Sequence, residues 1–409
     1  MKPVGASADP MSCATDDAFF SGIAYTIPYG IVLGVPMVDD LNPFVYDDPL
    51  PPDALIDRDE ETRKLLALAE GGHNTRLSAP RRYGKTSIIL RLLAEADRAG
   101  LHTVHVDFYR CVTRGEAARR IEEAYLARLV GPLRRTVSAL TRSWRTTVKA
   151  QAGGMAVQAE YIRGLDNQRL ADLLDLPKRI FAKSGTRTVV AFDEFQDFLR
   201  IDDGLDGLLR SKIQLHRHEA SYVFAGSEPG MLDELFNRKG RPLFDQARPI
   251  PVGPLGDGDL AEYIGARFDR TDRDPGAALE LLLRLARGHP QRAMLLAHHL
   301  WEHTERGQAA DEETYQATLD AVDRETRERF ERTWLDLGSA PAQRRVLAAL
   351  ANSRQSLYSK TTLLAFELDK SVAQQATQAL IYDGDLTRVD GRFEIVDPLL
   401  ERWLQRTQH

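Results

Sequence analysis

The sequence predicts an α/β fold with a parallel five-stranded sheet, followed by an all-helical segment and a C-terminal winged helix-turn-helix. Three observations indicate this. Apolar runs typical of buried strands alternate with amphipathic helical segments up to about Pro254. After that point helical periods follow one another without strands. Near the C-terminus, three short helical segments precede an Asp-Gly pair between two apolar runs, which is a strong hairpin signal.

The chain has 409 residues, more than one domain of ordinary size, so we expect several domains. The formal net charge of −6 gives no overall basic field that would recruit nucleic acid or membrane. The two cysteines form neither a disulfide framework nor a metal-binding spacing, which favours a reducing compartment and a cytoplasmic protein. The expected divisions are a disordered leader over 1–41, an α/β core over 42–254, a helical lid over 255–337 and the winged helix over 338–409.

An uncharged, apolar stretch over 18–38 approaches the length of a membrane span. Its glycines and prolines and its acidic flanks argue against a membrane anchor or a signal peptide. We therefore expect no membrane association, and an N-terminal hydrophobic anchor remains the alternative. A further hypothesis is that synthesis begins near Met37.

Within the core, a helix is expected over 57–70, because acidic residues fill its first turn and Gly71-Gly72 follows it. A short apolar run ends at Ser78, and a second helix is expected over 85–99. The segment 116–150 has a helical period and is basic in its second half. The remaining strands are expected over 103–108, 186–192, 221–225 and 250–252, and the later helices over 257–270, 276–287, 291–305 and 311–336.

The segment between the first strand and the second helix is a candidate phosphate-binding loop. It matches the pattern G-x-x-x-x-G-K-[ST] except at its first position, where Ala79 stands. Such a loop holds an anion with backbone N–H groups and the helix N-terminus. Because a methyl group disfavours positive φ, the loop is expected to begin with an ordinary backbone. A chance Gly-Lys-Thr at a helix start is the alternative. The candidate nucleotide-binding residues are Ala79, Pro80, Arg81, Arg82, Tyr83, Gly84, Lys85, Thr86 and Ser87.

Two side chains at the end of this loop have expected roles. Lys85 would reach the β- and γ-phosphates of ATP, and the Thr86 hydroxyl would bind Mg²⁺. Two carboxylates, Asp193 and Glu194, follow a continuous apolar run typical of a buried strand, at the edge where ligands bind in parallel sheets. Asp193 would hold Mg²⁺ and Glu194 would activate the attacking water. The alternative is that the pair caps the next helix.

Further positions in the chain also have candidate roles. Ser227 follows a strand and could lie between the attacking water and the γ-phosphate, or could cap the next helix. Arg292 begins a helix after Gly288-His289-Pro290 and could contact the γ-phosphate, or could be a solvated arginine. His289 is expected to form structural hydrogen bonds. Arg238, Arg241 or Arg248 could serve as an arginine finger, an arginine that contacts the nucleotide of a neighbouring subunit.

Taken together, these residues resemble the archaeal-type ATPases of the STAND and AAA+ group, the MNS clade, which are relatives of the origin-recognition initiators. The resemblance implies a sheet of order 5-1-4-3-2, a helical lid and a C-terminal winged helix. It also implies that Ser227 is sensor 1 and Arg292 a sensor 2 candidate. Family members often carry an arginine near the fifth strand where this chain has Phe244-Asp245-Gln246, which weakens the trans-acting finger. The resemblance is carried by Asn42-Pro43-Phe44, Ala79 to Ser87, Phe192 to Gln196, Phe224 to Ser227, Gly288-His289-Pro290 and Ile395 to Leu399.

DNA binding by the winged helix is possible but is not the favoured prediction. From Ala340 to His409 there are nine Lys plus Arg and eight Asp plus Glu, unlike a usual DNA-binding patch. The candidate recognition helix over 370–382 carries Gln374, Gln375 and Gln378, which could read adenine edges. Arg388 and Arg392 lie in the wing. A protein partner or self-association is the alternative.

The sequence therefore predicts an ATP-binding and ATP-hydrolysing conformational switch with Mg²⁺ as cofactor, slow turnover and the winged helix as output. One alternative is a DNA-binding regulator in which nucleotide is mainly structural. A second is a P-loop small-molecule kinase, against which the adjacent Asp193 and Glu194 argue.

Overall fold

The computed structural model describes residues 41–149, 166–353 and 355–407. The predicted leader and its apolar stretch over 18–38 lie outside these ranges, apart from Leu41. Among the described residues, no helix combines the length and the apolar character that a membrane crossing requires. Residues 42–409 form one compact unit.

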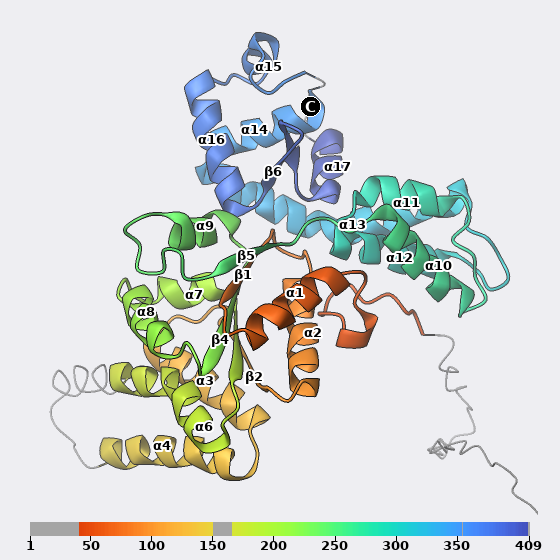
Figure 1. Cartoon of the computed structure of the whole chain (residues 1–409). Coiled ribbons are helices and arrows are strands. Elements are labelled where there is room, and N and C mark those ends of the chain that lie inside the picture. The colour runs from red at the N-terminus through yellow and green to blue at the C-terminus, as the bar shows by residue number, and fades with distance from the viewer. Residues whose placement is uncertain (1–40, 150–165, 354, 408–409) are drawn as a thin grey trace, which may run out of the picture. The chain divides into compact units, whose positions relative to one another are not determined.

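A parallel five-stranded sheet of order β2-β3-β4-β1-β5 lies within this unit (Figure 1). This is the order that the resemblance implied, and the candidate fifth strand is present. The register pairs Asp107 with Asp193 and Ser78 with Gly226, so the carboxyl ends of four strands share one edge. The strands are β1 Thr75–Ser78, β2 His102–Asp107, β3 Thr188–Asp193, β4 Ala220–Gly226 and β5 Arg248–Pro251.

Helices cover both faces of the sheet, because its central strands are apolar on both sides. Val189 and Ala191 of β3 pack with α1 and α2, whereas Val190 and Phe192 pack with the helices of the opposite face. The helices of the core are α1 Asp59–Glu70, α2 Lys85–Arg98, α3 Arg114–Arg128, α4 Gly131–Lys149, α6 Leu176–Ser184, α7 Phe195–Arg200, α8 Leu205–Leu215 and α9 Pro229–Asn237, with a short 3-10 turn η2 at Pro52–Ala54.

The basic segment predicted as one helix over 116–150 contains two helices. The helical conformation is interrupted between α3 and α4 at Leu129-Val130, directly before Gly131-Pro132. Gly131 adopts a left-handed φ of 56°, and a residue before proline is disfavoured in the α conformation. Periodicity alone extended the helix through this point.

Four helices follow the sheet, as the sequence predicted. They are α10 Asp257–Asp269, α11 Ala278–Ala286, α12 Pro290–His303 and α13 Glu312–Asp336. Most of their buried apolar residues belong to one cluster that also contains Phe44 and most buried apolar residues of the C-terminal segment. The predicted boundaries at 254/255 and 337/338 therefore remain predictions.

The C-terminal segment has the predicted order of three helices and a hairpin, and a further helix follows. Asp390 and Gly391 form the hairpin turn with φ values of 49° and 83°, as a tight Asp-Gly turn requires. The elements are η3 Leu337–Ser339, α14 Pro341–Asn352, α15 Lys360–Ala365, α16 Lys370–Asp383, β6 Leu386–Val389, β7 Arg392–Ile395 and α17 Pro398–Thr407.

Candidate functional site

The loop from Ala79 to Gly84 connects β1 to α2 at the carboxyl edge of the sheet. Arg82 and Gly84 have left-handed φ values of 68° and 81°, which turn N–H groups of a short loop toward one side. Ala79 is not among the positive-φ residues, in agreement with the ordinary backbone expected there. The loop and the first turn of α2 therefore have the form of an anion nest.

Lys85 lies inside this loop, with only 5% of the residue exposed. Its Nζ donates to the carbonyl oxygen of Ala79 at 2.9 Å and to that of Pro80 at 2.8 Å. Burial lowers the pKa of Lys85 to about 8, although the nearby carboxylates of Glu194 and Asp193 oppose this. A buried amine beside two carboxylates can attract a phosphate strongly, because little water screens it.

Thr86 and Asp193 meet across the sheet edge, where the Thr86 hydroxyl donates to Asp193 Oδ2 at 2.7 Å. Burial alone would raise the pKa of Asp193. The interactions with His105 and the Thr86 hydroxyl lower the pKa by more than burial raises it, so it lies below its ordinary value. Two hard oxygens thus converge, and one of them is ionised. No group of three or more His, Cys, Asp or Glu among the described residues could hold a metal alone. This donor set fits Mg²⁺, which in proteins commonly takes one carboxylate and completes its shell with phosphates and water.

Glu194 follows Asp193 in a left-handed conformation, with a φ of 48°. Its Oε2 accepts a hydrogen bond from the Ser227 hydroxyl at 2.8 Å and a second from Gln196 Nε2. Glu194 makes no capping hydrogen bond to α7, and the residue at the N-cap of α9 is Glu228 rather than Ser227. The helix-cap alternatives therefore do not describe these two side chains, which are held against each other instead.

A cavity of about 200 Å³ opens beside the loop. Lys85, Thr86 and Glu194 line it together with apolar side chains from distant parts of the chain. This arrangement suits a ligand with a charged tail and an apolar head. The sequence did not predict the apolar lining of this cavity or the buried Arg58 beside it. The apolar lining residues are Val45, Tyr46, Leu50, Leu55, Ile56, Leu255, Pro290 and Met294.

The segment 42–50, which we call the strap, forms one wall of this cavity. It is fixed at both ends: Asn42 Nδ2 donates to the carbonyl of His298 in α12 at 3.0 Å, and Leu50 N donates to Ser87 Oγ at 3.0 Å. Phe44 is buried between these points. The Ser87 hydroxyl therefore binds the strap.

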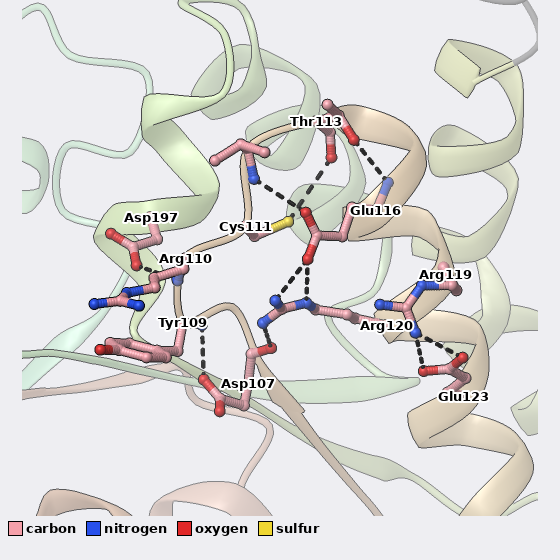
Figure 2. Close-up of polar contacts among 11 residues, drawn as sticks. Asp107, Tyr109, Arg110, Cys111, Thr113, Glu116, Arg119, Arg120, Glu123 and Asp197 are labelled. Carbon is pink, nitrogen blue, oxygen red and sulfur yellow. Dashed lines mark hydrogen bonds and ion pairs between the residues drawn. The ribbon is translucent and has the colours of Figure 1, made fainter.

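The loop after β2 lies at the same edge of the sheet and is connected to α7 (Figure 2). Arg110 N donates to Asp197 Oδ2 at 2.7 Å, and Tyr109 N donates to Asp107 Oδ1 at 2.8 Å. The Arg81 guanidinium lies 6.0 Å from the centre of the Tyr109 ring. Arg81 thus extends toward the loop after β2.

The structure does not bring Arg292 to the residues around Lys85. Only 2% of its side chain is exposed, and it forms a two-point ion pair with Asp397, in which Nε lies 2.8 Å from Oδ1 and Nη2 contacts Oδ2. The alternative of a solvated arginine is therefore wrong, and Arg292 lines a different cavity. His289 caps α12 by accepting from Arg292 N at 3.4 Å, which confirms its structural role.

The three arginines considered for a trans-acting finger lie at the surface. Arg238 and Arg241 both pair with Glu234 of their own chain, with Arg238 Nη1 at 2.9 Å from Oε1. Arg248 lies in the edge strand β5 and is exposed. Pairing and exposure of this kind are ordinary for surface charges, and an arginine acting on a neighbouring subunit stays a prediction.

No family model and no curated protein matches this sequence. Among solved structures, the chain is similar to the Walker-type ATPase of Pyrococcus abyssi, with a TM-score of 0.62 and 19% identity over 90% of this chain and 100% of that one. It is also similar to the ORC2 protein of Aeropyrum pernix in its ADPNP–ADP complexes, with a TM-score of 0.56 and 13% identity over 88% and 95% of the two chains. The chain thus has the fold of P-loop, AAA+-like ATPases, as its sequence predicted.

Proposed function

We propose that this protein binds ATP with Mg²⁺ in the cavity beside the loop 79–84 and hydrolyses the nucleotide. The observation that carries the proposal is the convergence of Lys85, Thr86, Asp193, Glu194 and Ser227 at one edge of the sheet, next to that cavity. The phosphates would face Lys85, and the base would face the apolar wall formed by the strap and α12.

Each residue then has a distinct task. The loop N–H groups and Lys85 hold the phosphates, while Thr86 and Asp193 hold Mg²⁺. Bound Mg²⁺ would neutralise part of the phosphate charge. Glu194, oriented by Ser227 and Gln196, positions a water molecule and accepts its proton. Arg292 reaches the γ-phosphate only if it leaves Asp397, so in this conformation the terminal phosphate lacks that cation.

The wider function that we propose is a nucleotide-driven conformational switch. Residues 255–337 act as the lid, since Leu255, Pro290 and Met294 line the cavity. The segment 338–409 acts as a winged-helix output module, because Asp397 binds Arg292 at the start of α12. Its partner is another protein or a second copy of this chain. DNA remains the second candidate, since Gln374, Gln375 and Gln378 are exposed on α16.

The test is release of inorganic phosphate from ATP by the full chain without any acceptor molecule. Phosphate release is expected in the wild type and should fall by about ten-fold or more in Lys85→Ala, because the variant removes a buried charge that binds phosphate. Lys64→Ala changes an exposed lysine of α1 and should keep full activity. Turnover that requires an acceptor would favour a kinase, and undiminished turnover in Lys85→Ala would exclude the proposed site.

A further inference from the structure

A second cavity, of about 290 Å³, also borders the phosphate loop, and Arg82 lines both this cavity and the first one. The loop contributes Pro80, Arg81 and Arg82, and the remaining lining comes from α12, α13 and the C-terminal segment. Four of the lining side chains are arginines, whereas the lining carboxylates are Asp385 and Asp397 only. The arginines are Arg81, Arg82, Arg292 and Arg329.

Two guanidinium groups in this cavity carry buried N–H groups that lack a hydrogen-bond partner among the described residues. They are Nη1 of Arg292 and Nη2 of Arg329. The guanidinium carbons of Arg292 and Arg329 lie 5.7 Å and 4.9 Å from the centre of the Phe330 ring, which places both around one side chain. Asp397 satisfies Nε and Nη2 of Arg292 and leaves Nη1 unused.

The neighbouring guanidinium groups repel one another. Burial is the main reason that the pKa of Arg329 falls to about 10, and the positive charges of Arg292 and Arg82 lower it further. The pKa of Arg82 is also lowered, first by the loss of contact with water and second by the positive charge of Arg292. A bound anion with several oxygens would relieve this repulsion and would accept from the unpaired N–H groups.

We propose that this cavity is a binding site for an oxyanion of the phosphate class, separate from the nucleotide cavity. Planar guanidinium forks match the geometry of a tetrahedral oxyanion, and arginine keeps its charge when partly buried. The proposal does not depend on ATP hydrolysis. It does have a consequence for the chain: an anion on Nη1 of Arg292 lies beside the carboxylate of Asp397, and the repulsion between the two negative charges weakens the ion pair between α12 and the C-terminal segment.

The probe is inorganic phosphate, titrated calorimetrically into the full chain at constant ionic strength. Because phosphate can also bind the loop at Lys85, the titrations use the Lys85→Ala background. Saturable binding is expected there, at least about ten-fold weaker after Arg329→Gln, since a charge-assisted hydrogen bond is lost. Arg327→Gln, an exposed arginine of the same helix, is the matched control and should leave the affinity unchanged.

A second variant guards against a folding defect. Thr333 lines the cavity and is exposed, so Thr333→Glu should fold normally while placing a carboxylate among the guanidinium groups. It should abolish phosphate binding without lowering the melting temperature measured in phosphate-free buffer. Weakened binding in Arg329→Gln and lost binding in Thr333→Glu, with the control unaffected, support the site.

Three outcomes overturn the proposal. If the wild type binds phosphate in a parallel titration and Lys85→Ala does not, the anion binds in the nucleotide loop. If all variants give the same unsaturable signal, the effect is that of an adventitious ion only. If Arg329→Gln weakens ATP binding but no variant binds free phosphate, the cavity receives the terminal phosphate of the nucleotide and is not a separate site.

Discussion

The side chain of Glu194 is held in one orientation beside the nucleotide cavity. Its carboxylate is oriented by Ser227 and Gln196, while Lys85 and Thr86 face the same cavity. Glu194→Gln keeps the size and the hydrogen bonds of this side chain but cannot accept a proton. The expected result is ATP turnover reduced by about 10²- to 10⁴-fold, the usual contribution of a general base, with nucleotide affinity retained.

Fluorescent-nucleotide titration and phosphate release measured on the same sample separate binding from turnover in this variant. Glu262→Gln, an exposed position on α10, serves as the control for a change of charge. Wild-type turnover in Glu194→Gln would remove Glu194 from the role of base. Loss of nucleotide binding would instead point to a positioning role.

His289 gives the stability of the protein a defined dependence on pH. Burial is the main cause that lowers its pKa from 6.5 to about 4, and the positive charge of Arg292 adds to this, against the opposing effect of Asp397. Below pH 6.5 the unfolded chain binds a proton at this residue that the folded chain does not. The free energy of unfolding should therefore fall as the pH falls from 6.5 to about 4, by up to about 3 kcal/mol.

His289→Asn tests this dependence, because asparagine can cap α12 but does not titrate. Urea unfolding at several pH values should show a smaller loss of stability between pH 6.5 and 4 in this variant than in the wild type. His218→Asn changes an exposed histidine and should keep the wild-type slope. Parallel curves for wild type and His289→Asn would contradict the assignment.

At the scale of elements, α9 and α16 are in direct contact. A Cβ atom added to Gly230 of α9 would lie 2.5 Å from the Cα of Tyr382, a backbone atom that a side-chain rotation cannot move. Gly230→Ala should therefore displace the end of α16 and cost roughly 1–3 kcal/mol, as overpacking does. Hydrogen exchange should rise in the last turn of α16.

The matched control for this contact is Gly207→Ala in α8, where an added Cβ meets no atom within 4 Å. Alanine should be neutral or stabilising there, because glycine is a poor helix former. Equal exchange in α16 for the two variants would show that α9 does not fix this helix.

The sequence predicted those elements whose signals are local. Buried strands such as β3 and β4 are apolar runs, and the Asp390-Gly391 turn is a two-residue signal. It did not predict the break before Gly131, because the helical period continues on both sides of it. It also missed α17, which follows the hairpin directly.

For the candidate site, too, the sequence predicted the parts that local signals mark. Lys85, Thr86, Asp193, Glu194 and Ser227 follow strand ends, so their convergence follows from the fold. The strap and Met294 were not predictable, because residues from distant parts of the chain form the cavity and no spacing connects them. The pairing of Arg292 with Asp397 was missed for the same reason.

At the scale of the whole molecule, the ion pair between Arg292 and Asp397 connects α12 to the C-terminal segment. Asp397→Asn leaves a buried guanidinium without its counter-charge, which should lower the free energy of unfolding by about 3 kcal/mol. Arg292→Met removes the charge as well, so the double variant should lose less stability than the sum of the two single variants. Thermal unfolding of the four proteins measures this coupling, and strict additivity would deny it.

The strand order has a consequence for synthesis on the ribosome. In the described part of the chain, β1 precedes the phosphate loop and has β4 and β5 as its two neighbours, and β4 does not begin until Ala220. At about 5–20 residues per second, translation needs on the order of ten seconds to supply that partner. During this interval β1 exposes two unpaired edges in the nascent chain, so a chaperone that shields β1 should raise the yield of native protein.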